Sequence, residues 1–171
     1  MLQKKIAPFF GLDGSGKPEP PDITEELDEL MRKHAKELIN YFRDAVERAN
    51  TGYEYASSGS IWLSVPSVAF FDTLGFFIEK VRTGGDWDLK NNIYPSRDQY
   101  MYNGMIYDGE DIGNIHFGYV GAALYTSGFL HFGAGVYQIF SGSKWEYWST
   151  LFDEPRDSEM IEYGIKLYEG R

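Results

Sequence analysis

Cysteine is absent from this chain of 171 residues, and histidine occurs only at positions 34, 116 and 131. The lack of cysteine excludes a disulfide framework, a thiolate metal site and a cysteine nucleophile, but it leaves the redox compartment open. A zinc site made only of imidazoles would need all three histidines to converge. The sequence therefore assigns no metal ligand, and it identifies no cofactor.

Basic residues are also scarce. Lysine and arginine number 16 against 26 aspartates and glutamates, so the formal net charge is −10. Residues 98–143 contain no lysine or arginine at all. Because proteins that bind nucleic acids usually depend on a basic surface, this distribution weighs against such a partner without excluding it.

Several familiar signals are missing as well. The sequence contains no phosphate-binding loop, no H-E-x-x-H zinc motif, no nucleophile elbow and no dinucleotide-binding glycine fingerprint. We expect no signal peptide at its start, because Pro8 interrupts the apolar stretch from Ile6 to Leu12. The longest stretch without charged residues, Ile112 to Ser143, is divided at Thr126–Gly128. We therefore expect buried core segments there and no stable insertion into a membrane.

The chain does have ample apolar material for one packed core. Hydrophobic residues make up 43% of it and aromatic residues 17%, which excludes wholesale disorder. Glycine and proline are dense in residues 1–21, and we expect this segment to be a flexible lead-in or linker. Residues 22–171 are expected to form a single domain.

Apolar periodicity predicts a mainly α protein, a single compact helical domain with one small β-hairpin near residues 99–108; the alternative is an α+β domain. Asp22 followed by Glu25 is typical of a helix cap, and Asn103-Gly104 is typical of a two-residue hairpin turn. A polar loop is expected over Thr51–Ser60. The predicted helices span Ile23–Ala49, Ser67–Arg82, Ile112–Tyr125, Phe129–Phe140 and Asp157–Tyr168.

Two segments, residues 84–92 and 108–121, combine glycine, aromatic and polar residues at expected helix boundaries, where loops and free backbone amides build sites. They contain Asp88, Lys90 and His116. Histidine offers acid–base chemistry, lysine stabilises an anion, and a carboxylate orients the histidine. The alternative is structural: Asp88 caps a turn, Lys90 is a surface charge, and His116 forms a hydrogen bond within the core. His34 is expected to pack beside the apolar stripe of the first helix.

The same two segments carry a resemblance to a known family. Residues 84–90 (GGDWDLK) are similar to a G-G-x-W-D-x-K element, and residues 113–121 (GNIHFGYVG) are similar to a G-N-[IF]-[HN]-[FY]-G-Y-V-G element. Residues 133–138 and 157–168 continue the similarity. The chain thus resembles the bacterial polymorphic toxin type 44 family, predicted toxin domains at the C-terminal ends of large secreted proteins. The resemblance implies delivery into competing cells as part of a larger protein, a cognate immunity protein and ribonuclease activity.

The first hypothesis is therefore a ribonuclease toxin. In it His116 is the general acid or base for attack by the RNA 2′-hydroxyl, and Lys90 stabilises the phosphorane. Asp88 or Asn114 has the role of orienting the reacting groups. Trp87, Asp111, Tyr119 and Gln138 are assigned to substrate binding. RNA would also be held by stacking on tyrosines and by contacts to basic side chains. These residues are Tyr94, Tyr100, Tyr102, Tyr107, Lys80, Arg82, Lys90 and Arg97.

Two further hypotheses stay open. A cell-wall (peptidoglycan) hydrolase would use paired carboxylates as acid and base, namely Asp88 with Asp111 or Glu110. A non-enzymatic protein would be a membrane-active toxin that uses Ile112–Phe140, or an acidic binding module. The spacing of Asp108, Glu110 and Asp111 also resembles that of cation ligands in a loop, although acidic residues in a turn are usually solvated. The resemblance makes a hydrolase the first interpretation.

Overall fold

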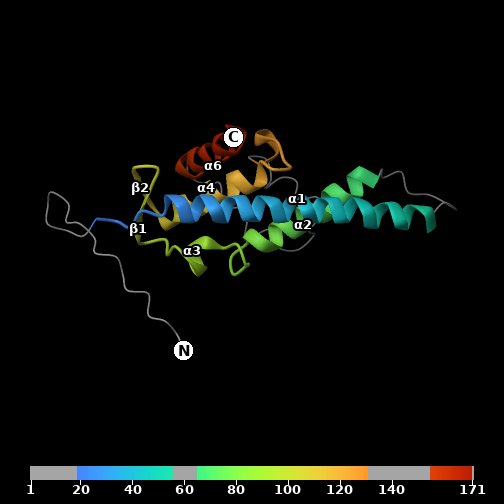
Figure 1. Ribbon diagram of the computed structural model, residues 1–171, viewed down its shortest axis with the longest axis horizontal. Helices are drawn as coiled ribbons and strands as arrows, with labels where there is room; N and C mark the ends of the chain where they lie inside the picture. The colour runs from blue at the N-terminus through green and yellow to red at the C-terminus, as the bar shows by residue number, and fades with distance from the viewer. Residues whose placement is uncertain (1–18, 56–64, 131–154, 171) are drawn as a thin grey trace, which may run out of the picture.

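The computed structural model describes residues 19–55, 65–130 and 155–170. These residues form a mainly helical protein with one small antiparallel hairpin, as the sequence predicts. Figure 1 shows the long first helix running the length of the molecule, with the hairpin near its N-terminal end. In chain order the elements are α1 (Thr24–Tyr55), α2 (Val65–Val81), α3 (Leu89–Asn92), β1 (Gln99–Tyr102), β2 (Met105–Asp108), α4 (Gly109–Gly121) and α6 (Pro155–Glu169).

Helix α1 begins at the predicted cap and continues beyond its predicted end. The carboxylate of Asp22 accepts a hydrogen bond from the backbone N–H of Thr24 at 2.9 Å, which satisfies a free donor of the first turn. The helix extends to Tyr55, so the predicted polar loop is wrong for residues 51–55. Thr51 is accommodated because its hydroxyl donates to the carbonyl of Glu47 at 3.0 Å.

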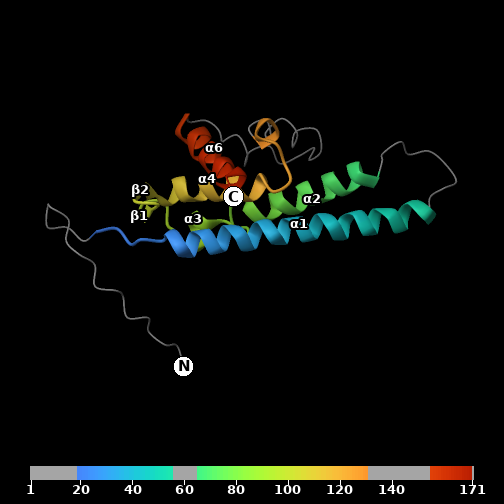
Figure 2. The same cartoon turned by 45° about the horizontal axis from the view of Figure 1, so that its top comes forward.

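Helices α1 and α2 lie side by side and antiparallel, and both extend past the rest of the described structure (Figure 2). The rings of Tyr41 and Phe76 stack at 4.0 Å, and the guanidinium of Arg48 lies 2.7 Å from the carboxylate of Asp72. Gly84 follows the end of α2 with φ of +77°, a conformation that glycine adopts at little cost. Helix α2 ends at Val81, one residue before the predicted end at Arg82.

The hairpin has the register that its turn sequence demands. Tyr102 pairs with Met105, and the two residues between them, Asn103 and Gly104, have φ values of 51° and 75°. Positive φ at both positions is the requirement of a type I′ turn, whose twist matches that of the two strands. The segment before α1 adds to the outer edge of β1, because the N–H of Met101 donates to the carbonyl of Pro21 at 2.9 Å.

Helix α4 occupies the interior. It begins three residues earlier than predicted, because Asp108 and Asp111 form a capping box in which each carboxylate accepts from the other residue's backbone N–H. It ends at Gly121, short of the predicted Tyr125. Nearly every residue of α4 is buried, including the polar side chains of Asp111, Asn114 and His116. The predicted helix Phe129–Phe140 lies outside the described residues from position 131 onward.

The core gathers around α4, which lies between α1 on one side and α6 on the other (Figure 2). Side chains from α1, α2, α4 and α6 are fully or almost fully buried there: Leu27, Met31, Leu38, Phe77, Ile112, Ile115, Val120, Ile161 and Ile165. In the part of the chain that the structure describes, no helix has both the length and the apolar character that crossing a bilayer requires.

The crossing of α4 and α6 is a contact between two backbones. A Cβ at Gly118 would lie 2.1 Å from the carbonyl oxygen of Ile161, and a Cβ at Gly164 would lie 2.1 Å from that of Ile115. These distances are far below van der Waals contact, so only glycine fits at the two positions.

We expect Gly118→Ala to lower the free energy of unfolding by about 1–3 kcal/mol, because α6 must move away and neighbouring core contacts are lost. Gly113→Ala on the same helix is the matched control, since a Cβ at Gly113 would have no atom of another element within 4 Å. The control should be neutral or stabilising by up to about 1 kcal/mol through helix propensity. Urea unfolding followed by circular dichroism measures both, and equal stability of the two variants would contradict the packing argument.

Candidate functional site

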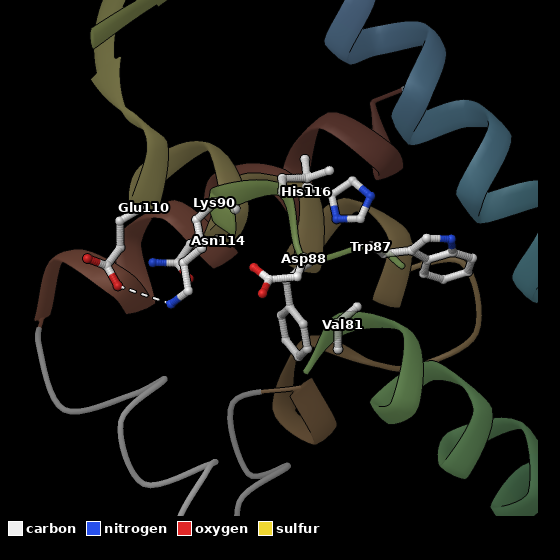
Figure 3. Close-up of a pocket in the computed structure, with 10 residues that line it drawn as sticks. Val81, Trp87, Asp88, Lys90, Glu110, Asn114 and His116 are labelled. Carbon is white, nitrogen blue, oxygen red and sulfur yellow. Dashed lines mark hydrogen bonds and ion pairs between the residues drawn. The ribbon is translucent and has the colours of Figure 1, made fainter. Parts of the chain in front are cut away.

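The two sequence segments singled out for chemistry meet at one small recess. The recess lies between the end of α2, the turn with α3, and one side of α4 (Figure 3). Its volume is about 30 Å³, room for one or two water molecules rather than a whole substrate. The lining residues are Val81, Trp87, Asp88, Leu89, Lys90, Glu110, Gly113, Asn114, His116 and Phe117. All four residues predicted to be catalytic are among them.

Asp88 holds the turn that follows α2. It is only 4% exposed, and one carboxylate oxygen accepts from the backbone N–H of Gly84 at 2.8 Å and from the side-chain amide of Asn91 at 2.6 Å. These bonds are those of a turn cap, the structural alternative for this residue. Asp88 therefore shapes the wall of the recess whether or not it takes part in chemistry.

Lys90 and Glu110 lie at the mouth of the recess. The ammonium of Lys90 donates to the carboxylate of Glu110 at 3.3 Å, and the two side chains are 29% and 52% exposed (Figure 3). Partly exposed pairs of this kind contribute at most about 1 kcal/mol, because water competes for both partners. Lys90 is thus a cation that an incoming anion is able to reach.

His116 forms the buried end of the recess and contacts a second histidine. Its Nε2 lies 2.8 Å from Nδ1 of His34, which comes from α1. The ring of His34 in turn stacks on Trp87, with ring centres 4.5 Å apart and an angle of 12° between the planes. The sequence predicts only packing for His34, and its hydrogen bond to His116 joins residues 82 positions apart that no local sequence signal connects.

Burial keeps both imidazoles neutral near pH 7. It lowers the pKa of His34 to about 4, with further lowering by the positive charges of Lys33 and Lys80. Burial also lowers the pKa of His116 to about 3, and the neighbouring His34 adds to this effect. Nε2 is the nitrogen that contacts His34, and Figure 3 shows the other ring nitrogen of His116, Nδ1, turned away from α1 toward the side of Asp88.

The start of α6 closes over the start of α4 through two polar contacts. The side-chain amide of Asn114 donates to the carboxylate of Asp157 at 2.8 Å, which fixes the amide at the edge of the recess. Arg156 donates to both carboxylate oxygens of Asp111, with its Nε at 2.7 Å. The carboxylate of Asp111 raises the pKa of Arg156. No local sequence signal identifies Arg156 or Asp157, because each is far along the chain from its partner.

The residues predicted to bind substrate are not gathered at one place. Trp87 lines the recess, whereas Asp111 does not line it, is 2% exposed and is engaged by Arg156. Tyr119 is also 2% exposed and packs edge-on against Tyr168 at 5.3 Å. Gln138 lies outside the described residues. Of these four, Trp87 alone is placed at the recess in the described ranges.

The predicted stacking surface for RNA bases is wrong. All four tyrosines proposed for it are buried, with exposed fractions between 0% and 8%: Tyr94, Tyr100, Tyr102 and Tyr107. Three of the cations proposed for phosphate contacts, Lys80, Arg82 and Lys90, each form an ion pair with a carboxylate. In residues 19–55, 65–130 and 155–170, no group of histidine and acidic side chains is arranged to hold a metal ion.

Comparison with known proteins identifies a family. The sequence matches the family described as bacterial toxin 44 (Ntox44) over residues 76–170, which is more than half of the chain. No curated protein and no solved structure matches it. The matched region contains the whole lining of the recess, but it does not include α1 and His34.

The buried histidine pair predicts acid sensitivity. An unfolded chain protonates its imidazoles near pH 6.5, whereas the folded protein resists protonation down to about pH 4 at His34 and about 3 at His116. As the pH falls below 6.5 the unfolded state binds more protons, so the free energy of unfolding should fall by up to about 1.4 kcal/mol per pH unit for each histidine.

Urea unfolding between pH 7.5 and 5 measures this dependence. The matched control is the double variant His34→Gln/His116→Asn, which removes both titrating groups and keeps every carboxylate. If the free energy of unfolding of the wild type falls with decreasing pH no more steeply than that of the double variant, the lowered pKa values of the two histidines are contradicted.

Proposed function

The chain belongs to the bacterial toxin 44 family, and from this premise we propose that it is a toxin domain that cleaves RNA at the recess. The family membership makes it a bacterial toxin domain. The observation that supports RNA cleavage is the convergence at the recess of a reachable cation, a side-chain amide and a neutral imidazole: Lys90, Asn114 and His116. Transfer of a phosphodiester to an internal hydroxyl uses a base and groups that stabilise the developing negative charge, and these three side chains are able to supply both.

The proposed reaction uses His116 as a base. A neutral imidazole with a lowered pKa is free to accept a proton near pH 7, but it is not protonated and so does not serve as the acid. In the proposal a water molecule in the recess passes the proton of the 2′-hydroxyl to Nδ1 of His116, and O2′ then attacks phosphorus. The bond from phosphorus to O5′ breaks, the leaving O5′ takes a proton from water, and a 2′,3′-cyclic phosphate is formed.

Lys90 and Asn114 have supporting roles in this proposal. Because the recess is too small for a nucleotide, the scissile phosphate would lie at its mouth, where the Lys90 ammonium is partly exposed. The ammonium would exchange Glu110 for the phosphate and stabilise the negative charge that develops in the transition state. The Asn114 amide, held by Asp157, supplies a further hydrogen-bond donor at the edge.

The carboxylates give less support to glycan hydrolysis. Two accessible carboxyl groups must flank the bond that a glycosidase breaks. Asp88 is 4% exposed and Asp111 is 2% exposed, and both accept hydrogen bonds from neighbouring donors. Of the three carboxylates considered for this reaction, Glu110 alone is substantially exposed. The structure therefore gives less support to peptidoglycan hydrolysis than to RNA cleavage.

Delivery into target cells is part of the same proposal, and membership of the toxin family supports it. We expect the domain to reach target cells as part of a larger secreted toxin, and we expect the producing cell to be protected by an immunity protein. An RNA substrate requires the domain to act in the cytoplasm of its target.

Lys90→Ala should lower kcat for RNA cleavage by roughly 100- to 1000-fold, because one group that stabilises the transition state is lost. Lys166→Ala is the matched control: Lys166 also pairs with a glutamate, Glu162 at 3.6 Å, but it does not line the recess. The rate of cleavage of a labelled RNA oligonucleotide by the purified chain measures both variants. Similar rates for Lys90→Ala and Lys166→Ala would overturn the role of Lys90.

The site of toxicity separates RNA cleavage from the alternatives. We expect expression of the chain in the bacterial cytoplasm to be toxic with loss of cellular RNA, and His116→Ala and Lys90→Ala to remove both effects. Export to the periplasm should be harmless. Lysis that occurs only on export would instead indicate a cell-wall hydrolase, and leakage of liposomes exposed to the purified chain would indicate a membrane-active toxin.

A further inference from the structure

The contact between His34 and His116 constrains where their protons are. Both rings are neutral near pH 7, so one nitrogen of the 2.8 Å contact donates and the other accepts. Either His34 Nδ1 carries the proton and His116 is protonated on Nδ1, or His116 Nε2 carries it and His116 Nδ1 is an acceptor. Nδ1 of His116 is the nitrogen turned away from α1 (Figure 3). It is a hydrogen-bond donor in the first arrangement and an acceptor, able to act as a base, in the second.

We propose that His34 is a positioning residue that accepts a hydrogen bond from Nε2 of His116 and so leaves Nδ1 of His116 free to act as a base at the recess. The consequence for catalysis rests on the proposed function. The arrangement itself is a property of the folded chain. In this arrangement His34 orients the base His116, the role that the third residue has in a catalytic triad.

The surroundings of His34 hold it in place for this role. Its ring lies on the face of Trp87, and Trp87 is packed edge-on against Phe76 at 5.7 Å between ring centres. His34 and His116 meet at 90°, with their ring centres 5.0 Å apart, so the His116 ring edge is directed at His34. Because His34 is 6% exposed and His116 is 1% exposed, neither ring is free to rotate without displacing core side chains.

The contact also offsets the weakness of a buried base. When Nδ1 of His116 accepts a proton, the bond from Nε2 to His34 becomes charge-assisted, which strengthens it. The partial charge that His34 then takes up lies against the face of Trp87, where the ring electrons attract it. A neutral His34 would in this way assist proton uptake by His116, whereas the positive charge of a protonated His34 lowers the pKa of His116.

This assignment extends the functional unit beyond the family match. His34 belongs to α1, whereas the match begins at residue 76 in α2. The matched region supplies the recess, and α1 supplies the group that decides which nitrogen of His116 is protonated. The site is complete only when α1 is packed against α4.

Nitrogen-15 NMR of the full chain tests the arrangement without any assay of activity. At pH 7 the wild-type spectrum should show a protonated Nε2 and an unprotonated Nδ1 for His116. His34→Phe keeps a ring over Trp87 but removes the acceptor, so it should shift His116 toward a mixture of the two neutral forms. A wild-type His116 protonated on Nδ1, or a spectrum unchanged by His34→Phe, would overturn the inference.

Kinetics test the catalytic consequence. His34→Phe should lower kcat for RNA cleavage by roughly 10- to 100-fold with KM unchanged, a loss within the range of positioned acid–base groups. His34→Gln, whose amide oxygen is able to accept from Nε2, should retain most of the rate and the wild-type His116 protonation. Near-ultraviolet circular dichroism checks that each variant is folded.

The outcomes separate this inference from the proposed function. If the wild-type chain cleaves no RNA, the proposed function fails, and the NMR spectra still decide whether His34 sets the protonation of His116. If the wild type cleaves RNA and His34→Phe does so with unchanged kcat, the positioning role fails alone. If His34→Phe does not fold, the wild-type NMR spectrum and the spectrum and kcat of His34→Gln still test whether His34 sets the protonation of His116.

Discussion

The close approach of α4 and α6 is the contact on which the site depends. Gly118 and Gly164 allow the two backbones to touch, and this contact fixes both the position of α4 along α6 and its rotation. Asn114 and His116 lie close to Gly118 along the helix, so fixing the backbone there also fixes their directions. The same crossing brings the start of α6 over the start of α4, where Arg156 and Asp157 reach their partners. The packing of α4 against α6 thus sets the geometry of the polar groups.

Local pairing of charges, more than the net charge, decides what the surface is able to bind. The chain carries a formal charge of −10, and Lys80, Arg82 and Lys90 each already contact a carboxylate. Those ion pairs are partly exposed and individually weak, so exchanging Glu110 for a phosphate at Lys90 costs little. Affinity for RNA would come from few contacts, and its dependence on salt would be correspondingly shallow.

Local features of the fold are predictable from sequence, and contacts between distant segments are not. Asn103-Gly104 specifies its turn because few other pairs adopt positive φ twice, and the period of α1 specifies which face is buried. Likewise, the two sequence elements locate the recess. The pairing of His34 with His116, and that of Arg156 with Asp111, leave no periodic or local trace. The wrong surface assignment of four tyrosines arises because composition does not distinguish a stacking platform from a core: Tyr94, Tyr100, Tyr102 and Tyr107.

The sequence element around His116 bears on how general the site is. The family's G-N-[IF]-[HN]-[FY]-G-Y-V-G element admits asparagine at this position. An asparagine amide would still donate to Nδ1 of His34 and keep α4 tied to α1, but it would not accept a proton near neutral pH. A chain with asparagine there needs a different base, and Glu110 is a carboxylate that both lines the recess and is 52% exposed. The contact to α1 is therefore compatible with either residue, whereas a base at this position requires histidine.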